Sequence, residues 1–280
     1  KCWVPGWQWY GADNQYHRWL SGMLHGDFGH SLRDQRPVAV RIGEAVRWTL
    51  QINGLAILFA YLLSIPLGVY AAAYVGRRFD RITSFVLFLL YSLPSFWVAS
   101  LLILFLTTPE WLDIFPSMGV GEVGPEVGWW QRLSVRASHL FLPIFCLTYG
   151  SLAFISRQVR GSMIEVLGSD YIRTARAKGL SEGRVLWRHA FRNGLFPLIT
   201  MFAGVLPAAL AGSVVIEVIF NIPGMGRLTV DSILTKDWPV VYALLLLAGT
   251  LTLVGILLAD LLYAWADPRV RLGKAKNATA

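Results

Sequence analysis

The residues most able to support a specific interaction lie in one polar segment, 157–192, between two long apolar stretches. The segment carries eight Lys/Arg and three acidic residues, a net charge of +5 over 36 residues. Its pattern predicts a helix ending near Gly168, a short helix over residues 170–178 and a further helix from Ser181. Gly179 suits the left-handed backbone of a helix C-terminus. A short basic helix of this kind can lie on lipid headgroups or dock into a groove of a partner protein.

The other chemically active residues do not form a catalytic or metal-binding set. The five His are scattered, and Cys2 and Cys146 do not have metal-site spacing. The sequence has no GxxxxGK[ST] phosphate loop, and the glycines at 119, 121 and 124 lack the strand and helix that flank a dinucleotide site. We therefore expect a non-catalytic chain with no cofactor or metal of its own.

The composition indicates an integral membrane protein. Hydrophobic residues make up 55% of the chain and charged residues 15%, whereas soluble domains carry about 25% charged residues. The basic residues lie in short segments beside apolar runs, where membrane topology and contact with lipid headgroups account for them. Nucleic acid is therefore not an expected partner.

Five stretches are apolar for long enough to cross a bilayer, which takes about 20 helical residues. They are residues 48–76, 82–109, 137–156, 193–216 and 238–259. Prolines occur in or near these stretches, and membrane bundles tolerate them because neighbouring groups satisfy the freed carbonyls. The expected fold is an all-α polytopic helical bundle with five spans in this chain.

The Lys and Arg residues predict the orientation of the chain in the membrane. Fifteen of the 25 lie in segments 77–81 and 157–192 and in the tail after Pro268, and this denser set should be cytoplasmic. We therefore expect an extracytoplasmic region at 1–47, a transmembrane domain at 48–266 and a cytoplasmic tail at 267–280. Segments 110–136 and 221–237 become outer loops. Because residues 1–47 show no signal sequence, we expect a further span upstream, giving six in the full protein.

Two acidic residues, Glu217 and Asp260, lie at the edges of apolar stretches, where burial of charge is costly and suggests a role. Glu217 is predicted to pair with Arg227 and stabilise an outer turn, which we favour over substrate contact. Asp260 is expected to anchor a helix contact or pair with a basic residue near the cytoplasmic side. We do not interpret Glu217 or Asp260 as part of a proton relay.

Several blocks of sequence resemble one family. DYIRTARAKGLS, followed by VLWRHAFRNGLFPL, resembles the cytoplasmic coupling motif of ABC-transporter permeases, and more narrowly that of dipeptide, oligopeptide and nickel import permeases. The blocks HGDFGHSL, YSLPSFWVA, SVVIEVIFNIPGMGRL and DLLYAWADPRVRLG agree in order, so the resemblance covers residues 15–273. Arg173 stands where other import permeases usually have the glutamate of a Glu-Ala-Ala motif. Pro197 lies further along the chain from the glycine of the motif than the corresponding proline does in sugar permeases. Both departures are typical of the peptide branch.

The resemblance implies a permease subunit of an ATP-driven importer in the bacterial inner membrane. Such a subunit forms the pathway for peptides or similar small solutes delivered by an external binding protein. The implied partners are a second homologous permease, two cytoplasmic ATP-binding subunits that hold ATP and Mg, the external binding protein and membrane lipid. The residues implied to dock on an ATP-binding subunit are Asp170, Tyr171, Arg173, Thr174, Ala175, Lys178 and Gly179.

Two alternatives remain at this stage. An ion-coupled secondary transporter would be expected to show deep ionisable residues and inverted repeats, and neither is evident. Within the family, the solute could instead be a nickel complex, haem or another small molecule. The sequence does not decide the substrate.

Overall fold

The computed structural model describes residue 11 and residues 14–124, 126–195, 198, 201, 209 and 213–266. The regular elements among these residues are helices, accompanied by one isolated β-bridge between His30 and Pro37. The all-α class predicted from the sequence is confirmed. The tail at 267–280 and most of residues 1–13 lie outside the described residues.

Three described helices are long and apolar enough to cross a membrane. They are α2 (Val38–Ala73), α5 (Trp129–Leu167) and α13 (Trp238–Ala266), of which the segment Trp238–Leu258 meets the span criterion. These helices contain most or all of the predicted spans at 48–76, 137–156 and 238–259. The predicted span at 193–216 lies largely outside the described residues, so the structure supports three or four spans within the described part of the chain.

The single span predicted at 82–109 is instead a bent pair of helices. Helix α3 (Arg78–Ser92) and helix α4 (Ser95–Leu106) meet at an angle of 93°. Pro94 lacks an N–H and restricts the residue before it, and Leu93 is extended with φ −88° and ψ 125°. The Tyr149 hydroxyl donates a hydrogen bond of 3.0 Å to the Leu93 carbonyl, which satisfies a backbone group at the break.

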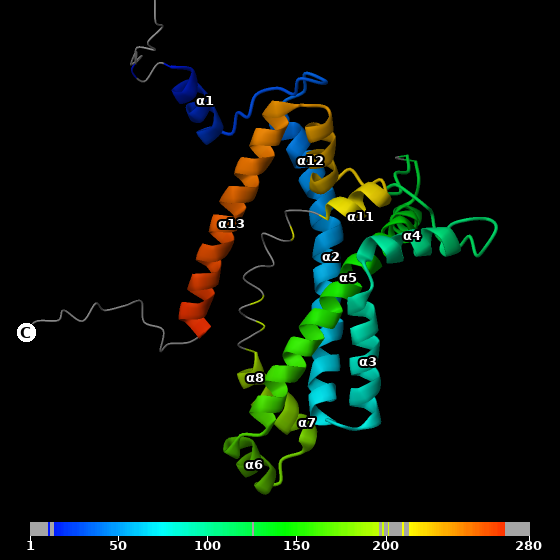
Figure 1. Ribbon diagram of the computed structural model, residues 1–280, viewed down its shortest axis with the longest axis vertical. Helices are drawn as coiled ribbons and strands as arrows, with labels where there is room; N and C mark the ends of the chain where they lie inside the picture. The colour runs from blue at the N-terminus through cyan, green and yellow to red at the C-terminus, as the bar shows by residue number, and fades with distance from the viewer. Residues whose placement is uncertain are drawn as a thin grey trace, which may run out of the picture.

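Helices α2 and α5 cross at the centre of the molecule and form its main contact (Figure 1). Small residues allow the close approach: a Cβ added at Gly68 would lie 2.6 Å from Val159 Cβ and 2.7 Å from the Ser156 carbonyl oxygen. Ser64 Oγ also donates a 3.0 Å hydrogen bond to the Leu152 carbonyl. Small side chains and interhelical hydrogen bonds are the usual means of joining helices in a membrane.

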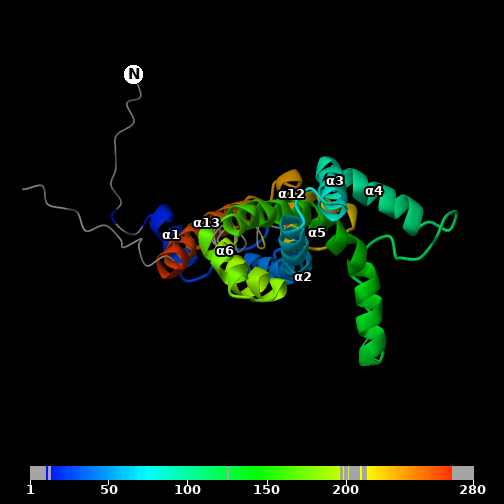
Figure 2. The ribbon, with the colours of Figure 1, turned by 90° about the horizontal axis from the view of Figure 1, so that it is seen from below.

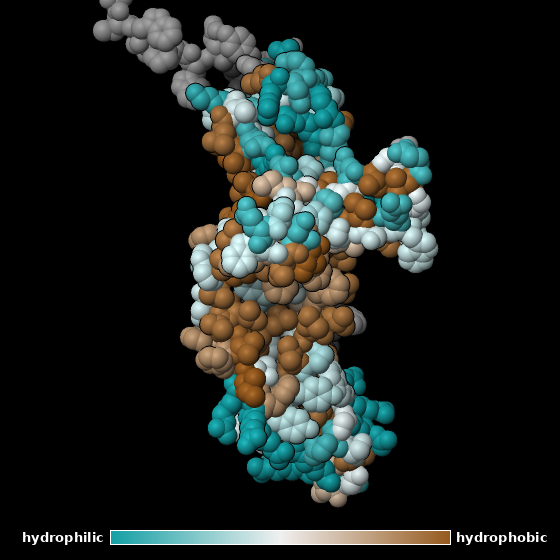
Figure 3. Space-filling model, turned by 90° about the vertical axis from the view of Figure 1, so that its right-hand side faces the viewer, coloured by the Kyte–Doolittle hydropathy of each residue, from teal (hydrophilic) through white to brown (hydrophobic). Residues whose placement is uncertain are grey.

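Polar residues gather at the two ends of the molecule, with an apolar band between them (Figure 3). One end contains the turn between α2 and α3 together with α6 (Asp170–Ala177), and the opposite end contains α1 (Gln15–Leu24) and α12 (Met225–Leu234) (Figure 1). Seen from below, the N-terminal part of α5 projects beyond the other helices (Figure 2). The segments 77–81 and 157–192, both predicted from the charge pattern to be cytoplasmic, therefore lie at the same end of the molecule.

Candidate functional site

Helix α6 is short because its ends are defined locally. Helix α5 ends at Leu167 with Gly168 as its cap, and Ser169, with extended backbone angles, precedes α6. The helix runs over eight residues, Lys178 is its C-cap, and Gly179 follows with φ +76°. A positive φ favours glycine. The predicted end of the preceding helix, the short helix and the left-handed glycine are confirmed, with the helix one residue shorter than predicted.

One face of α6 is buried against the segment that returns to the membrane. This return segment comprises α7 (Glu182–Arg184), the π-helix η1 (Val185–Ala190) and α8 (Phe191–Gly194). Ile172 is fully buried and Ala175 is 7% exposed, and both belong to one apolar cluster with Val185, Leu186 and Ala190. Their spacing of three residues places them on the same helix face. The cluster also contains Val159 and Met163 of α5, so it ties α6 to the bundle.

Two polar contacts fix α6 more precisely. Arg176 Nε lies 2.9 Å from Glu182 Oε1, an ion pair that spans the turn at Gly179. Asn193 Nδ2 donates a 2.8 Å hydrogen bond to the Tyr171 hydroxyl. These exposed contacts connect α6 to the return segment near both of its ends, in addition to the buried apolar cluster.

The opposite face of α6 is exposed and mixed in charge. Asp170, Arg173, Thr174 and Lys178 are all exposed. Arg173 and Asp170 form an ion pair at 3.1 Å, with side chains 73% and 94% exposed. A pair this exposed contributes little to stability, so both side chains remain available to a partner.

The structure thus divides the predicted docking residues between two roles. Ala175 lies on the inner face and packs within this chain, because it shares the helix face of Ile172. Tyr171 is 43% exposed but its hydroxyl is engaged by Asn193. The remaining predicted residues lie on exposed parts of the helix or its cap: Asp170, Arg173, Thr174, Lys178 and Gly179.

Glu217, on α11 (Val214–Ile219), is fully buried near the opposite end of the molecule from α6. Its carboxylate accepts hydrogen bonds from Thr49 Oγ1 at 2.9 Å and from the backbone N–H of Arg227 at 3.0 Å. Added Cβ atoms at Gly224 and Gly226 would lie 2.5 Å and 3.0 Å from atoms of this carboxyl group. Two glycines are therefore needed for the backbone to surround the acid so closely.

The predicted ion pair between Glu217 and Arg227 is not formed, although the two residues are in contact. The Arg227 guanidinium instead contacts the Asn221 side chain and lies 3.6 Å from Asp231. Only the backbone N–H of Arg227 binds Glu217, because the main chain turns towards the acid at Gly224. Asp260 is exposed on α13, and among the described residues it has no ion pair.

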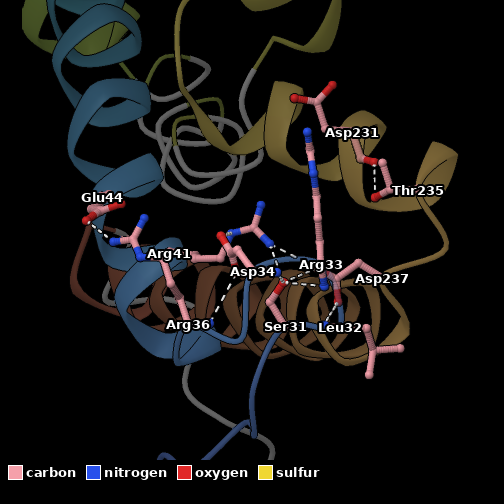
Figure 4. A network of polar contacts seen from close by, with 10 residues as sticks. All are labelled: Ser31, Leu32, Arg33, Asp34, Arg36, Arg41, Glu44, Asp231, Thr235 and Asp237. Atoms are coloured by element: carbon pink, nitrogen blue, oxygen red, sulfur yellow. Dashed lines mark hydrogen bonds and ion pairs between the residues drawn. The ribbon is translucent and has the colours of Figure 1, made fainter.

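A second buried acid, Asp237, was not identified from the sequence. It is 1% exposed and accepts hydrogen bonds from Ser31 Oγ at 2.5 Å, the Leu32 backbone N–H at 2.9 Å and Arg41 Nη1 at 2.9 Å (Figure 4). This network joins the loop before α2 to the start of α13. In the sequence, Asp237 is recognisable only as an acid directly before an apolar stretch. That position does not identify partners about 200 residues away.

A third acid, Asp80, also has partners that the sequence did not reveal. It is 4% exposed, and its two oxygens lie 2.6 Å and 2.9 Å from Nε and Nη2 of Arg160 on α5. The Gly76 backbone N–H donates to Asp80 at 2.9 Å. The sequence signal was a single acid within the basic segment 77–81. Among the described residues, no group of three or more His, Cys, Asp or Glu side chains could hold a metal ion.

Comparison with known proteins identifies the family. The family model described as "Binding-protein-dependent transport system inner membrane component" matches residues 64–272. The oligopeptide transport system permease protein AppB of Bacillus subtilis is 40% identical over 257 residues, covering 91% of this chain and 79% of the relative. The dipeptide transport system permease protein DppB of Escherichia coli K12 is 36% identical over 284 residues, covering 95% and 81% respectively.

The fold is also similar to that of a solved transporter. A chain of the inward-facing MetNI methionine ABC transporter aligns with a TM-score of 0.61 and 18% identity, over 81% of this chain and 96% of that chain. A second crystal form gives a TM-score of 0.59. The chain belongs to the family of binding-protein-dependent transport system inner membrane components, and it is a multi-pass permease subunit of a bacterial ABC importer.

Proposed function

We propose that this chain forms part of the path by which peptides cross the bacterial inner membrane. The support is that relatives 36–40% identical over more than nine-tenths of this chain are named as oligopeptide or dipeptide permeases. A second homologous permease completes the path, and an external binding protein delivers the substrate. ATP and Mg are bound by two cytoplasmic ATP-binding subunits, which carry out hydrolysis.

Helix α6 is the part of this chain that docks on an ATP-binding subunit. The observation that carries this proposal is the division of α6 into a buried face and an exposed face. Ile172 and Ala175 anchor the helix within the chain, while Asp170, Arg173 and Lys178 face outward. A helix that is fixed on one side and polar on the other can transmit the movement of a bound partner. A helix lying on lipid would need an apolar face free for the membrane, whereas the buried side chains of α6 pack within the chain.

Movement of α6 then follows the state of the ATP-binding subunits. When ATP closes these subunits, the two docked helices of a permease pair are drawn together. The permease bundles move as rigid bodies, the pathway opens outward and substrate enters from the binding protein. Hydrolysis returns the pathway to the inward-open state.

The topology of the working protein follows the charge pattern. Residues 1–47 form an extracytoplasmic region, 48–266 a transmembrane domain with five spans, and 267–280 a cytoplasmic tail. Glu217 and Arg227 stabilise the outer turn through the hydrogen bond between the Glu217 carboxylate and the Arg227 backbone N–H, and Asp260 lies near the cytoplasmic side. None of the three takes part in proton transfer.

Charge reversal on α6 tests the docking proposal. Arg173→Glu and Lys178→Glu should each reduce the amount of ATP-binding subunit that co-purifies with the permease pair, by about tenfold if a close charge contact is reversed. Arg157→Glu is the matched control, because Arg157 is exposed on α5 and makes the same charge change away from α6. Recovery and uptake that are unchanged in both α6 variants would overturn the docking assignment.

The substrate proposal needs the reconstituted complex. Proteoliposomes containing both permeases and the ATP-binding subunits, supplied with the binding protein, should accumulate labelled dipeptides and oligopeptides only when ATP is present on the cytoplasmic side. Nickel and haem serve as competing solutes in the same assay. Peptide uptake driven by a proton gradient without ATP would instead support a secondary transporter.

A further inference from the structure

The ion pair between Asp80 and Arg160 joins three pieces of the chain at the end of the molecule that contains α6. Asp80 lies in the first turn of α3, and Arg160 lies in α5. Asp80 also accepts the Gly76 backbone N–H from the turn after α2 and lies 3.4 Å from the Ser84 hydroxyl. With one arginine bound through two nitrogens, the geometry is that of a bidentate pair, which fixes orientation as well as distance.

A second contact of α5 lies directly beside this pair. Val159, the residue before Arg160, is the side chain that leaves no room for a Cβ at Gly68 of α2. Val159 is 1% exposed and lies in the same apolar cluster as Ile172 and Ala175 of α6. Two consecutive residues of α5 therefore contact different helices: Val159 packs closely on α2, and Arg160 forms an ion pair with α3.

The position of these contacts along α5 matters because α6 follows the same helix. Arg160 is seven residues before Leu167, where α5 ends, which corresponds to about two helical turns or 10 Å. The helix is continuous over this distance. A displacement of α6 can therefore reach Val159 and Arg160 through an unbroken stretch of helix. The same stretch contacts α8, where Ser162 Oγ donates a 3.0 Å hydrogen bond to the Gly194 carbonyl.

We propose that Asp80 and Arg160 are positioning residues that make the α2–α3 hairpin move together with α6. The inference rests on the proposed docking of α6, and it adds a specific route by which that movement reaches the membrane domain. Close packing at Gly68 and the hydrogen bond from Ser64 Oγ to the Leu152 carbonyl join α5 to α2, but these two contacts do not involve α3. The ion pair supplies a directional link from α5 to α3, so the loss of its charge should weaken the coupling between the movement of α5 and that of the hairpin.

The test measures peptides imported per ATP hydrolysed by the reconstituted complex with its binding protein. Asp80→Asn keeps the size of the side chain and an acceptor for the Gly76 N–H, but it removes the charge that binds Arg160. Asp80→Asn, Arg160→Gln and the double variant should each lower the ratio by about threefold or more, a size typical of changes along a coupling network. The double variant should be no worse than the single variants, because all three lack the same link.

Two further variants separate coupling from folding. Arg157→Gln removes an exposed arginine one turn earlier on α5 and should leave the ratio unchanged. Arg160→Lys keeps the charge with fewer donors, so it should give an intermediate ratio even if the neutral variants assemble poorly. If the pair only stabilises the structure, its loss should reduce the amount of assembled complex. The number of peptides imported per ATP hydrolysed should then stay at the wild-type value.

The outcomes distinguish this proposal from the one it rests on. A wild-type complex that imports peptide, with wild-type ratios in Asp80→Asn and in Arg160→Lys, would overturn the role of the ion pair alone. A wild-type permease that neither binds the ATP-binding subunit nor imports peptide with ATP would overturn both proposals. Additive losses in the double variant would show that the two residues act independently, which also contradicts the proposal.

Discussion

Thr49 on α2 and Glu217 on α11 are 168 residues apart in the chain, and their side chains form a 2.9 Å hydrogen bond in the protein interior. The same Thr49 hydroxyl accepts the Met225 backbone N–H at 2.7 Å. One hydroxyl therefore connects α2, α11 and the start of α12. Its loss leaves a buried acid with one fewer donor and a buried N–H without an acceptor.

Thr49→Val, which keeps the shape of the side chain, should lower the free energy of unfolding by about 1–3 kcal/mol, the usual consequence of leaving buried polar groups unsatisfied. The measurement is the thermal midpoint of the purified permease in detergent. Thr252→Val is the control, since the exposed Thr252 hydroxyl donates to the Ala248 carbonyl of its own helix rather than to another helix. An equal midpoint for the two variants would show that the Thr49 contact does not stabilise the fold.

The close approach of α2 and α5 predicts opposite results for two glycines of the same helix. Gly68→Ala places a Cβ 2.6 Å from Val159 Cβ, so the helices must separate, and overpacking of this kind costs about 1–3 kcal/mol. Among the described residues, an added Cβ at Gly54 would have no atom within 4 Å outside the adjoining part of its own helix. Gly54→Ala should therefore be neutral or stabilise by up to about 1 kcal/mol through helix propensity. Thermal unfolding of both variants provides the comparison, and a stable Gly68→Ala protein would refute the tight contact.

The two faces of α6 predict a contrast between two alanines. Ala175→Leu adds three carbons to the buried cluster beside Ile172 and Val185 and should destabilise the cytoplasmic segment by about 1–3 kcal/mol. Ala177→Leu adds the same atoms at an exposed position and should change the stability by less than about 0.5 kcal/mol. Hydrogen exchange of the backbone amides in 170–194 reports the local effect. Similar exchange rates in the two variants would contradict the inner placement of Ala175.

The buried network at Asp237 predicts that the loop before α2 depends on one carboxylate. Asp237→Asn removes the charge that binds Arg41 and one acceptor oxygen, with an expected cost of about 1–3 kcal/mol. The loop should then open more often, which trypsin cleavage after Arg33 would detect as a faster rate.

Glu44→Gln is the matched control for this loop. It removes an ion pair with Arg36 in which the side chains are 47% and 59% exposed, and such pairs contribute little to stability. Its cleavage rate should stay close to that of the wild type. If Asp237→Asn cleaves no faster than Glu44→Gln, the buried carboxylate does not hold the loop.

The sequence predicted those features that depend on neighbouring residues. The bounds of α6 followed from Gly168, Ser169 and Gly179, because each acts on the backbone within one or two positions. The long apolar helices followed from composition, since length and hydrophobicity alone decide whether a helix can span a bilayer. Pro94 lies within the single span predicted at 82–109, but the bend at this residue and the direction of α4 after it depend on the surrounding bundle, including the Tyr149 contact at Leu93.

The features that the sequence did not predict are contacts between distant side chains. Asp80 meets Arg160, and Asp237 meets Ser31 and Arg41, only because several helices have particular rotations about their axes. Glu217 and its contact with Arg227 were predicted, but the group of Arg227 that makes the contact was not. The bond comes from the Arg227 backbone rather than its guanidinium, and the course of the main chain at Gly224 and Gly226 cannot be read from residue types.

The separation of the two faces of α6 has a consequence for how such a permease can change over time. The side chains that fold the helix onto its own chain, Ile172 and Ala175, are different from those that face outward, Asp170, Arg173 and Lys178. With α6 docked as proposed, the outer residues can be exchanged without disturbing the fold. A small number of substitutions could then refit the same membrane scaffold to a different energy-supplying subunit.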